Sequence, residues 1–161
     1  MKTAIVYYSM SGNTEQTAKK IAERIQADLI KIEPEKVYPS SGFKKFFWGG
    51  KSAVMGETPA LLPYEFRAEE YDRIIIGTPV WAGTFTPPIR TFINDNRESF
   101  KSKRVSAFVC LSGAGADKAL IKLKDFIGVT NLEATLVLID PKDKPNSVND
   151  EKIEEFCSLI K

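Results

Sequence analysis

The fold is indicated by Ser9-Met10-Ser11-Gly12-Asn13-Thr14, a stretch of mostly small or polar residues between an apolar segment and an amphipathic one. Residues 3–8 before it are mostly β-branched or aromatic and carry no charge, which is typical of a strand buried on both faces of a parallel sheet. From Thr17 to Ile25 after it, apolar residues recur at helical spacing with charged residues between them. The stretch therefore joins a buried strand to a helix.

A turn of this kind directs backbone N–H groups and hydroxyls at one point above a helix N-terminus, where a phosphate binds well. With one glycine and no lysine, it lacks the Gly-Lys-Ser/Thr ending of a triphosphate loop and the spaced glycines of a dinucleotide fingerprint. The hydroxyls of Ser9, Ser11 and Thr14 and the Asn13 amide would hold a terminal phosphate by hydrogen bonds. The sequence favours a cofactor phosphomonoester, although the same residues are also ordinary helix caps.

Composition limits the class of protein. A chain of 161 residues suits a single domain over residues 1–161. Its 23 basic and 21 acidic residues argue neither for nor against a nucleic-acid partner, and we expect none. Its apolar runs are too short to span a bilayer, so we expect no membrane partner. Cys110 and Cys157 fall at predicted core positions without metal-ligand spacing, which suits a reducing compartment, so we expect a cytoplasmic location.

The chain contains no histidine. This excludes the usual forms of Ser-His-Asp and Cys-His hydrolases, of HExxH metalloproteases and of Cys2His2 zinc sites. We expect no metal ligands and no catalytic side chains. Any reaction is expected to belong to a bound cofactor.

Strands and helices alternate along the chain. Four further strands are predicted, over residues 29–32, 73–76, 105–111 and 134–139. Helices are predicted around Ile89 to Ile93 with Pro87 or Pro88 in the first turn, around Leu120 to Ile127, and around Ile153 to Ile160 with Asn149 or Asp150 as the cap. This order predicts an α/β fold with a parallel sheet covered on both faces.

The segment from Pro34 to Arg67 is less regular. Residues 41–55 could form a helix, but Gly49-Gly50 is expected to interrupt it. The aromatic stretch from Phe43 to Trp48, which includes Phe46 and Phe47, would either seal the sheet edge or core, the favoured interpretation, or form a partial lid over a pocket.

Ligands of a parallel α/β sheet bind outside the carboxyl ends of the strands, near the point where strand order reverses. Three predicted loops share that edge: the first loop (residues 9–14), the second loop (residues 78–84) and the third loop (residues 112–116). The first offers phosphate donors, the second offers the Trp81 indole, and the third offers nearly bare backbone. Together they predict a pocket for a phosphate at one end and a flat ring at the other.

These loops give the chain a resemblance to the flavodoxin family of FMN-binding proteins. Ser9-x-Ser11-Gly12-Asn13-Thr14, Gly77 to Trp81 and Ser112 to Gly115 follow the order and spacing of the family, and the resemblance covers essentially the whole chain. The Phe47-Trp48-Gly49-Gly50 run and Pro59 to Pro63 resemble a branch described broadly as flavodoxin family proteins or NAD(P)H-dependent flavin oxidoreductases. The resemblance implies a flavodoxin-like, doubly wound, five-stranded parallel sheet of order 2-1-3-4-5, with FMN as cofactor.

The resemblance also implies the cofactor-binding residues. They are Ser9, Met10, Ser11, Gly12, Asn13 and Thr14 for the phosphate, Thr78, Pro79, Val80, Trp81, Ala82 and Gly83 for the isoalloxazine ring, and Ser112, Gly113, Ala114 and Gly115 for its pyrimidine side. Trp81 would stack or lie edge-on against the ring. In flavodoxins a flexible peptide of the second loop responds to flavin reduction, and Gly83 is the residue best suited to such a change.

Two features depart from the family pattern. The third loop has no aromatic residue, so one face of the ring is expected to be open. Typical flavodoxins are strongly acidic and therefore strong reductants, whereas this chain is nearly neutral. We therefore expect a less negative potential for the fully reduced flavin.

Three functions are consistent with these residues. The first is an electron carrier that docks a redox partner protein, and the second is an NAD(P)H-dependent FMN oxidoreductase with a quinone or other small acceptor. The third is a cofactor-free interaction module. Tyr7-Tyr8-Ser9 and Gly77-Thr78-Pro79 lack the acidic residues of a receiver domain, and the first loop lacks the cysteine and arginine of a small phosphatase.

Overall fold

The computed structural model describes residues 1–39 and 42–161, with side chains described outside residues 42–47. Its centre is a five-stranded parallel sheet of order β2-β1-β3-β4-β5, which confirms the predicted α/β fold and strand order. The strands are β1 (Thr3–Tyr7), β2 (Asp28–Lys31), β3 (Arg73–Pro79), β4 (Arg104–Leu111) and β5 (Thr135–Ile139). Strand β3 runs three residues beyond its predicted end because Gly77, Thr78 and Pro79 continue its pairing with β4.

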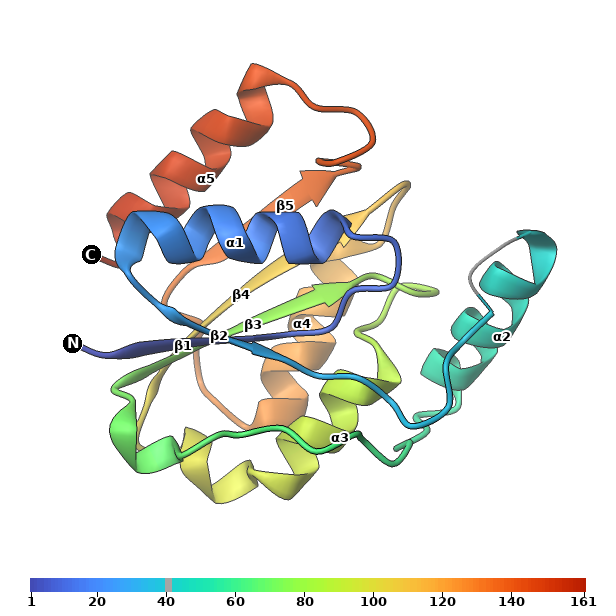
Figure 1. The fold of residues 1–161 in the computed structure, drawn as a ribbon, viewed down its shortest axis with the longest axis horizontal. Coiled ribbons are helices and arrows are strands. Elements are labelled where there is room, and N and C mark those ends of the chain that lie inside the picture. The colour runs from blue at the N-terminus through green and yellow to red at the C-terminus, as the bar shows by residue number, and fades with distance from the viewer. Residues whose placement is uncertain (40–41) are drawn as a thin grey trace.

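Helices cover both faces of this sheet (Figure 1). The α-helices are α1 (Asn13–Ile25), α2 (Gly42–Val54), α3 (Pro87–Asp95), α4 (Ala116–Ile127) and α5 (Ser147–Leu159), and the short 3-10 helices are η1 (Ala68–Glu70) and η2 (Arg97–Phe100). Helices α1 and α5 lie on one face, and α3 and α4 lie on the other. No helix among the described residues has the length and apolar character needed to cross a bilayer.

The core is divided between these two faces by the alternation of side chains along each strand. In β1 and β3, Ile5 and Ile75 pack with α1 and α5, whereas Val6 and Ile76 pack with α3 and α4. Both sets are fully buried, as expected for parallel strands covered on two sides. The sheet is thereby packed on both faces, and its carboxyl edge carries the three predicted loops.

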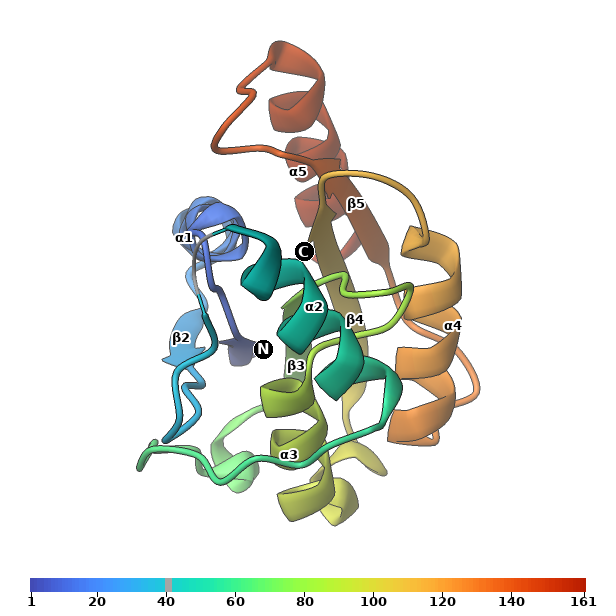
Figure 2. The same ribbon diagram turned by 90° about the vertical axis from the view of Figure 1, so that its right-hand side faces the viewer.

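Helix α2 contradicts the expected break at Gly49-Gly50, because it continues through both glycines to Val54. Figure 2 looks onto the carboxyl edge of the sheet and shows α2 crossing it. A Cβ on Gly49 would stand 3.2 Å from the Trp81 ring, so the glycine permits close packing rather than ending the helix. The expected roles of Phe43, Phe46 and Phe47 lie outside the described side chains, and Trp48 is half-exposed beside Lys51.

The predicted start of helix α3 is confirmed, whereas the predicted cap of α5 is not. Pro87 and Pro88 occupy the first turn of α3, as expected. The expected cap of α5 at Asn149 or Asp150 is wrong, because the helix begins at Ser147 and Asn146 caps it by accepting from the Asn149 amide at 2.9 Å. Asn146 is the better cap because it lies outside the helix with an extended backbone.

Candidate functional site

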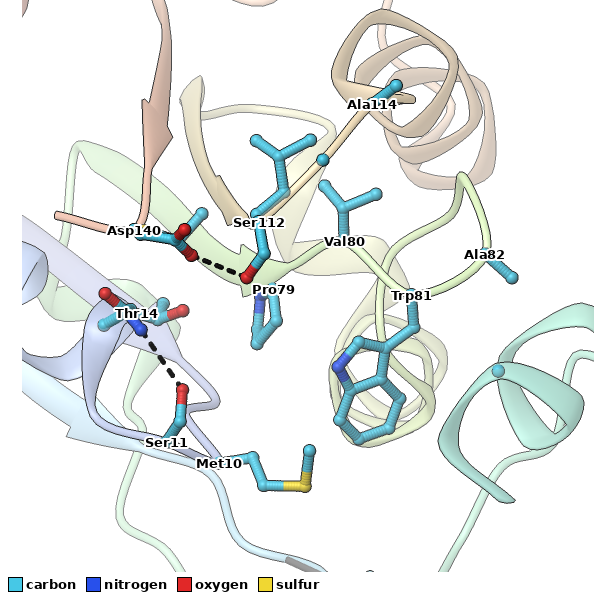
Figure 3. A pocket seen from close by; sticks show the side chains of 15 residues that line it. Met10, Ser11, Thr14, Pro79, Val80, Trp81, Ala82, Ser112, Ala114 and Asp140 are labelled. Atoms are coloured by element: carbon cyan, nitrogen blue, oxygen red, sulfur yellow. Dashed lines mark hydrogen bonds between the residues drawn. The ribbon is translucent and has the colours of Figure 1, made fainter. Parts of the chain in front are cut away.

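A cavity of about 220 Å³ opens at the carboxyl edge of the sheet, between the three loops (Figure 3). The residues that line it are Met10, Ser11, Asn13 and Thr14 of the first loop, Pro79, Val80, Trp81 and Ala82 of the second, Ser112, Gly113 and Ala114 of the third, and Gly50, Cys110, Leu111 and Asp140. The fold therefore brings together three loops that lie far apart in the sequence, and α2 and Asp140, the residue after β5, add to the lining.

Five of the residues expected to bind the cofactor do not line this cavity. They are Ser9, Gly12, Thr78, Gly83 and Gly115. The Ser9 hydroxyl accepts from the Gly12 amide at 3.2 Å, and the buried Thr78 hydroxyl lies 3.0 Å from that of Thr86, so these side chains shape their loops. Gly83 and Gly115 bring the second and third loops together, since a Cβ on Gly115 would stand 3.1 Å from the Gly83 Cα.

The first loop ends in unpaired hydrogen-bond donors. Gly12 takes a left-handed conformation (φ 96°) and begins α1 without a side-chain cap. Within the described residues, the amides of Asn13, Thr14 and Glu15 have no acceptor. The Thr14 hydroxyl lines the cavity, is buried with its residue only 1% exposed, and has no hydrogen-bond partner there either. One hydrogen-bond acceptor placed at the start of α1 could bind these amides and the Thr14 hydroxyl. A negatively charged acceptor would also interact favourably with the helix dipole.

The second loop makes a tight turn that holds Trp81. The Trp81 amide donates to the Thr84 carbonyl at 2.9 Å, and the Thr84 amide donates back at 3.1 Å. The two residues between them have positive φ, 50° at Ala82 and 69° at Gly83, as in a type I′ turn. The turn therefore fixes the backbone of the residue that carries the indole.

The indole of Trp81 packs edge-on against two tyrosines. Its ring centroid lies 5.7 Å from that of Tyr8 and 5.2 Å from that of Tyr38, and Gly49 of α2 contacts the ring. Figure 3 shows the indole between Pro79 and α2, with its nitrogen toward the side of the cavity where Ser11 and Thr14 lie. Trp81 is thus both a packing residue and a wall of the cavity.

Asp140 is a cavity residue that the sequence analysis missed. It follows β5 with a positive φ of 40° and is buried. Its carboxylate accepts from the Ser112 hydroxyl at 2.5 Å and from Lys144 Nζ at 2.9 Å, and these hydrogen bonds hold its pKa below the usual value for aspartate. Asp140 therefore anchors the third loop. Its place at the carboxyl end of a parallel strand was the signal that could have revealed it.

Cys110 also lines the cavity, but its surroundings do not favour a thiolate. Burial raises the pKa of its thiol to about 11, and the hydroxyl of Thr17, the larger of the opposing contributions, offsets this only in part. Thr17 Oγ1 lies 3.6 Å from the Cys110 sulfur. The thiol therefore stays protonated near neutral pH and is a packing group rather than a nucleophile.

Comparison with known families agrees with this geometry. A family model described as Flavodoxin matches residues 2–146. The chain belongs to the flavodoxin family.

Solved structures similar to this flavodoxin family member share its fold. A flavoprotein of Lactobacillus acidophilus NCFM in complex with FMN is 22% identical, with a TM-score of 0.76 over 96% of this chain and 97% of that one. A protein of Bacteroides uniformis ATCC 8492 described as a flavoprotein is 26% identical, with a TM-score of 0.72 over 93% of this chain and 96% of that one. Both confirm the flavodoxin-like architecture.

One curated relative carries an enzyme name. The NAD(P)H dehydrogenase (quinone) of Chromohalobacter salexigens is 30% identical over 100 residues, which make up 56% of this flavodoxin family member. The same segment makes up 45% of that relative, so the match spans less than half of its length.

Proposed function

We propose that the cavity binds FMN and that the protein transfers electrons through it. The observation that supports this is the buried Thr14 hydroxyl, which lines the cavity and finds no partner among the described residues, beside three amides that also find no acceptor there. An unpaired buried polar group costs about 1 to 3 kcal/mol. A phosphate at the start of α1 would satisfy these groups together, which fits the phosphate end of FMN.

The second and third loops are suited to the ring of FMN. Trp81 and Ala82 line one side of the cavity, and Ser112 to Ala114 line another. The Trp81 indole N–H has no acceptor in the described part of the chain, so it is available to a polar atom of a ligand. The cavity is smaller than the roughly 300 to 1,000 Å³ of sites that enclose a ligand, so part of FMN would remain exposed. Bound FMN supplies reversible electron transfer, while the chain holds and orients it.

An exposed ring edge suits electron transfer to a redox partner protein, and this carrier role is our first proposal. The alternative is an NAD(P)H-dependent FMN oxidoreductase with a quinone or other small acceptor. The similarity to an NAD(P)H dehydrogenase (quinone) and the absence of an aromatic residue from the third loop favour it. We also propose a cytoplasmic location, because Cys110 and Cys157 are both free and buried.

Titration of the flavin-free protein with FMN and with riboflavin, followed by quenching of flavin fluorescence, tests the phosphate assignment. Thr14→Val keeps the side-chain shape but removes the hydroxyl, so FMN affinity should fall roughly 10- to 100-fold while riboflavin affinity changes little. The flavin-free variant should be at least as stable as the parent, because it loses an unpaired buried hydroxyl. Thr135→Val, at the exposed start of β5, is the control for the same chemical change.

Each outcome of this titration has a clear meaning. Equal losses of FMN and riboflavin in Thr14→Val would contradict the phosphate assignment. A parent protein that binds neither flavin would instead support a cofactor-free interaction module.

Anaerobic addition of NADH and then NADPH to the FMN-loaded protein separates the two redox roles. Rapid loss of flavin absorbance with either nucleotide would establish the reductase. The carrier role predicts inertness to both nucleotides together with ready reduction by dithionite.

A further inference from the structure

The β5–α5 loop (residues 140–146) lies against the first loop, a neighbour that the sequence analysis does not connect with the phosphate. The Lys142 amide donates to Asn13 Oδ1 at 2.8 Å. Asn13 Nδ2 in turn donates to Asp143 Oδ2 at 2.8 Å. The Asn13 side chain therefore fastens the two loops together through both ends of its amide.

Lys142 places a positive charge at the first loop. Its ammonium donates to the Ser11 carbonyl oxygen at 2.9 Å and lies 3.2 Å from the point where a Cβ on Gly12 would stand. In the described part of the chain, no carboxylate lies within 4.0 Å of this ammonium, whereas Lys144 pairs with Asp140 at 2.9 Å. The Lys142 charge is thus not neutralised by an ion pair, and the first loop has no charged side chain of its own.

We propose that Lys142 is a specificity residue that makes the pocket prefer a phosphorylated flavin to the same flavin without its phosphate. This inference rests on the proposed FMN function. A phosphomonoester carries about two negative charges at pH 7. The Lys142 ammonium now donates to a neutral carbonyl, and its interaction with such an anion would be more favourable. The Thr14 hydroxyl, which has no partner in the part of the chain that the structure describes, independently indicates where the anion would lie.

Asp143 acts in the opposite direction. Its carboxylate holds Asn13 but also adds a negative charge beside the same loop. Asp143→Asn removes that charge and keeps an oxygen that can accept from Asn13, while Lys142→Gln removes the positive charge and keeps the backbone amide that donates to Asn13. The two variants therefore change the local charge in opposite senses while both contacts of the Asn13 side chain with the β5–α5 loop can still form, and Lys142→Gln loses the bond from the ammonium to the Ser11 carbonyl.

The experiment is titration of the flavin-free protein with FMN and riboflavin at low and at high salt. Lys142→Gln should weaken FMN binding about five- to tenfold at low salt, leave riboflavin within about twofold, and reduce the salt dependence of FMN binding. Asp143→Asn should strengthen FMN binding about two- to threefold. Lys152→Gln, an exposed position on α5, is the matched control and should behave as the parent.

The outcomes separate this inference from the function on which it rests. An FMN preference and salt dependence that survive Lys142→Gln would overturn the role of Lys142 and leave FMN binding intact. Loss of both flavins to the same extent in Lys142→Gln would also overturn it, because Lys142 would then support the pocket rather than select the phosphate. A parent that binds FMN no more tightly than riboflavin would overturn the phosphate assignment itself.

Discussion

Gly49 of α2 and Trp81 of the second loop lie in direct contact, so close that a Cβ on Gly49 would stand 3.2 Å from the indole Cε3. The indole cannot easily move away, because Tyr8 and Tyr38 pack edge-on against it. The neighbouring Gly50 faces a looser contact, with its Cβ position 3.7 Å from that of Ala82. The two adjacent glycines of α2 thus differ in the room they leave for a side chain: an added methyl group would press on Trp81 at Gly49 but would fit at Gly50.

Gly49→Ala and Gly50→Ala should therefore differ in stability. Alanine in place of either glycine favours the helix by up to about 1 kcal/mol, and Gly50→Ala should show this gain. In Gly49→Ala the added methyl presses on a fixed ring, so we expect it to be about 1 to 2 kcal/mol less stable than Gly50→Ala. Urea unfolding of the flavin-free proteins measures the difference, and equal stabilities would mean that the indole yields freely.

Trp81→Phe should change the environment of a bound flavin. The variant keeps an aromatic ring in the wall of the cavity but removes the indole N–H and part of the aromatic surface that faces the cavity. We expect FMN to bind roughly 3- to 10-fold more weakly and its visible absorption bands to shift. Trp48→Phe is the control, because Trp48 is exposed and is not a lining residue. An unchanged flavin spectrum in Trp81→Phe would show that the indole serves packing alone.

The parallel sheet and its three loops were predictable because local patterns carry them. Uncharged β-rich runs separated by amphipathic helices define parallel strands, and the carboxyl ends of such strands must share an edge. Asp140 and Lys142 were missed although they follow the fifth strand at the same edge. No local motif marks them, since their relation to Ser112 and Asn13 exists only through contacts between distant segments.

The prediction of a helix break at Gly49-Gly50 is wrong for a different physical reason. Glycine weakens an isolated helix, and that local preference was the basis of the prediction. In the folded chain, contact with Trp81 makes the missing side chain of Gly49 an advantage. A local propensity of about 1 kcal/mol was therefore outweighed by packing that only the tertiary structure defines.

Arg73 and Glu133 form a bidentate ion pair at the end of the sheet opposite the cavity. Arg73 Nε and Nη2 donate to the carboxylate at 2.6 and 2.9 Å, and the Arg73 side chain is only 3% exposed. These bonds, with a smaller contribution from the exposed Arg104, hold the pKa of Glu133 below its ordinary value. The ionised pair is therefore part of the stability of the fold.

Glu133→Gln should lower the free energy of unfolding by about 3 kcal/mol at pH 7, because it leaves the buried Arg73 without its counter-charge. Since the folded pKa is depressed, the stabilisation is present above the ordinary value of roughly 4.3 and is lost as pH falls through the folded pKa. The gap between parent and variant should therefore shrink below about pH 4. Denaturant unfolding from pH 7 to 3 measures it, with Arg104→Gln as an exposed control expected to cost under about 1 kcal/mol. A gap that stays constant with pH would refute the ionic contribution.

Charge near a bound flavin sets part of its reduction potential. The charges of the 23 basic and 21 acidic residues of this chain nearly cancel. In a strongly acidic flavodoxin, by contrast, the net negative charge of the protein raises the energy of an anionic reduced flavin. Lys118, in the first turn of α4, adds a positive charge beside the second loop, with its Cδ 3.4 Å from the point where a Cβ on Gly83 would stand. Both features favour the reduced anion.

The midpoint potential for full reduction of bound FMN should therefore be less negative than in the acidic flavodoxins, as measured by potentiometric titration. Lys118→Gln should make it more negative by roughly 10 to 30 mV, since loss of one nearby positive charge raises the energy of the anion by about 0.5 to 1.5 kcal/mol over two electrons. Lys122→Gln, one turn further along α4, is the matched control and should shift it less. A parent potential as low as in the acidic flavodoxins would contradict the role of net charge. Equal shifts in the two variants would mean that the position of Lys118 beside Gly83 does not set the field at the ring.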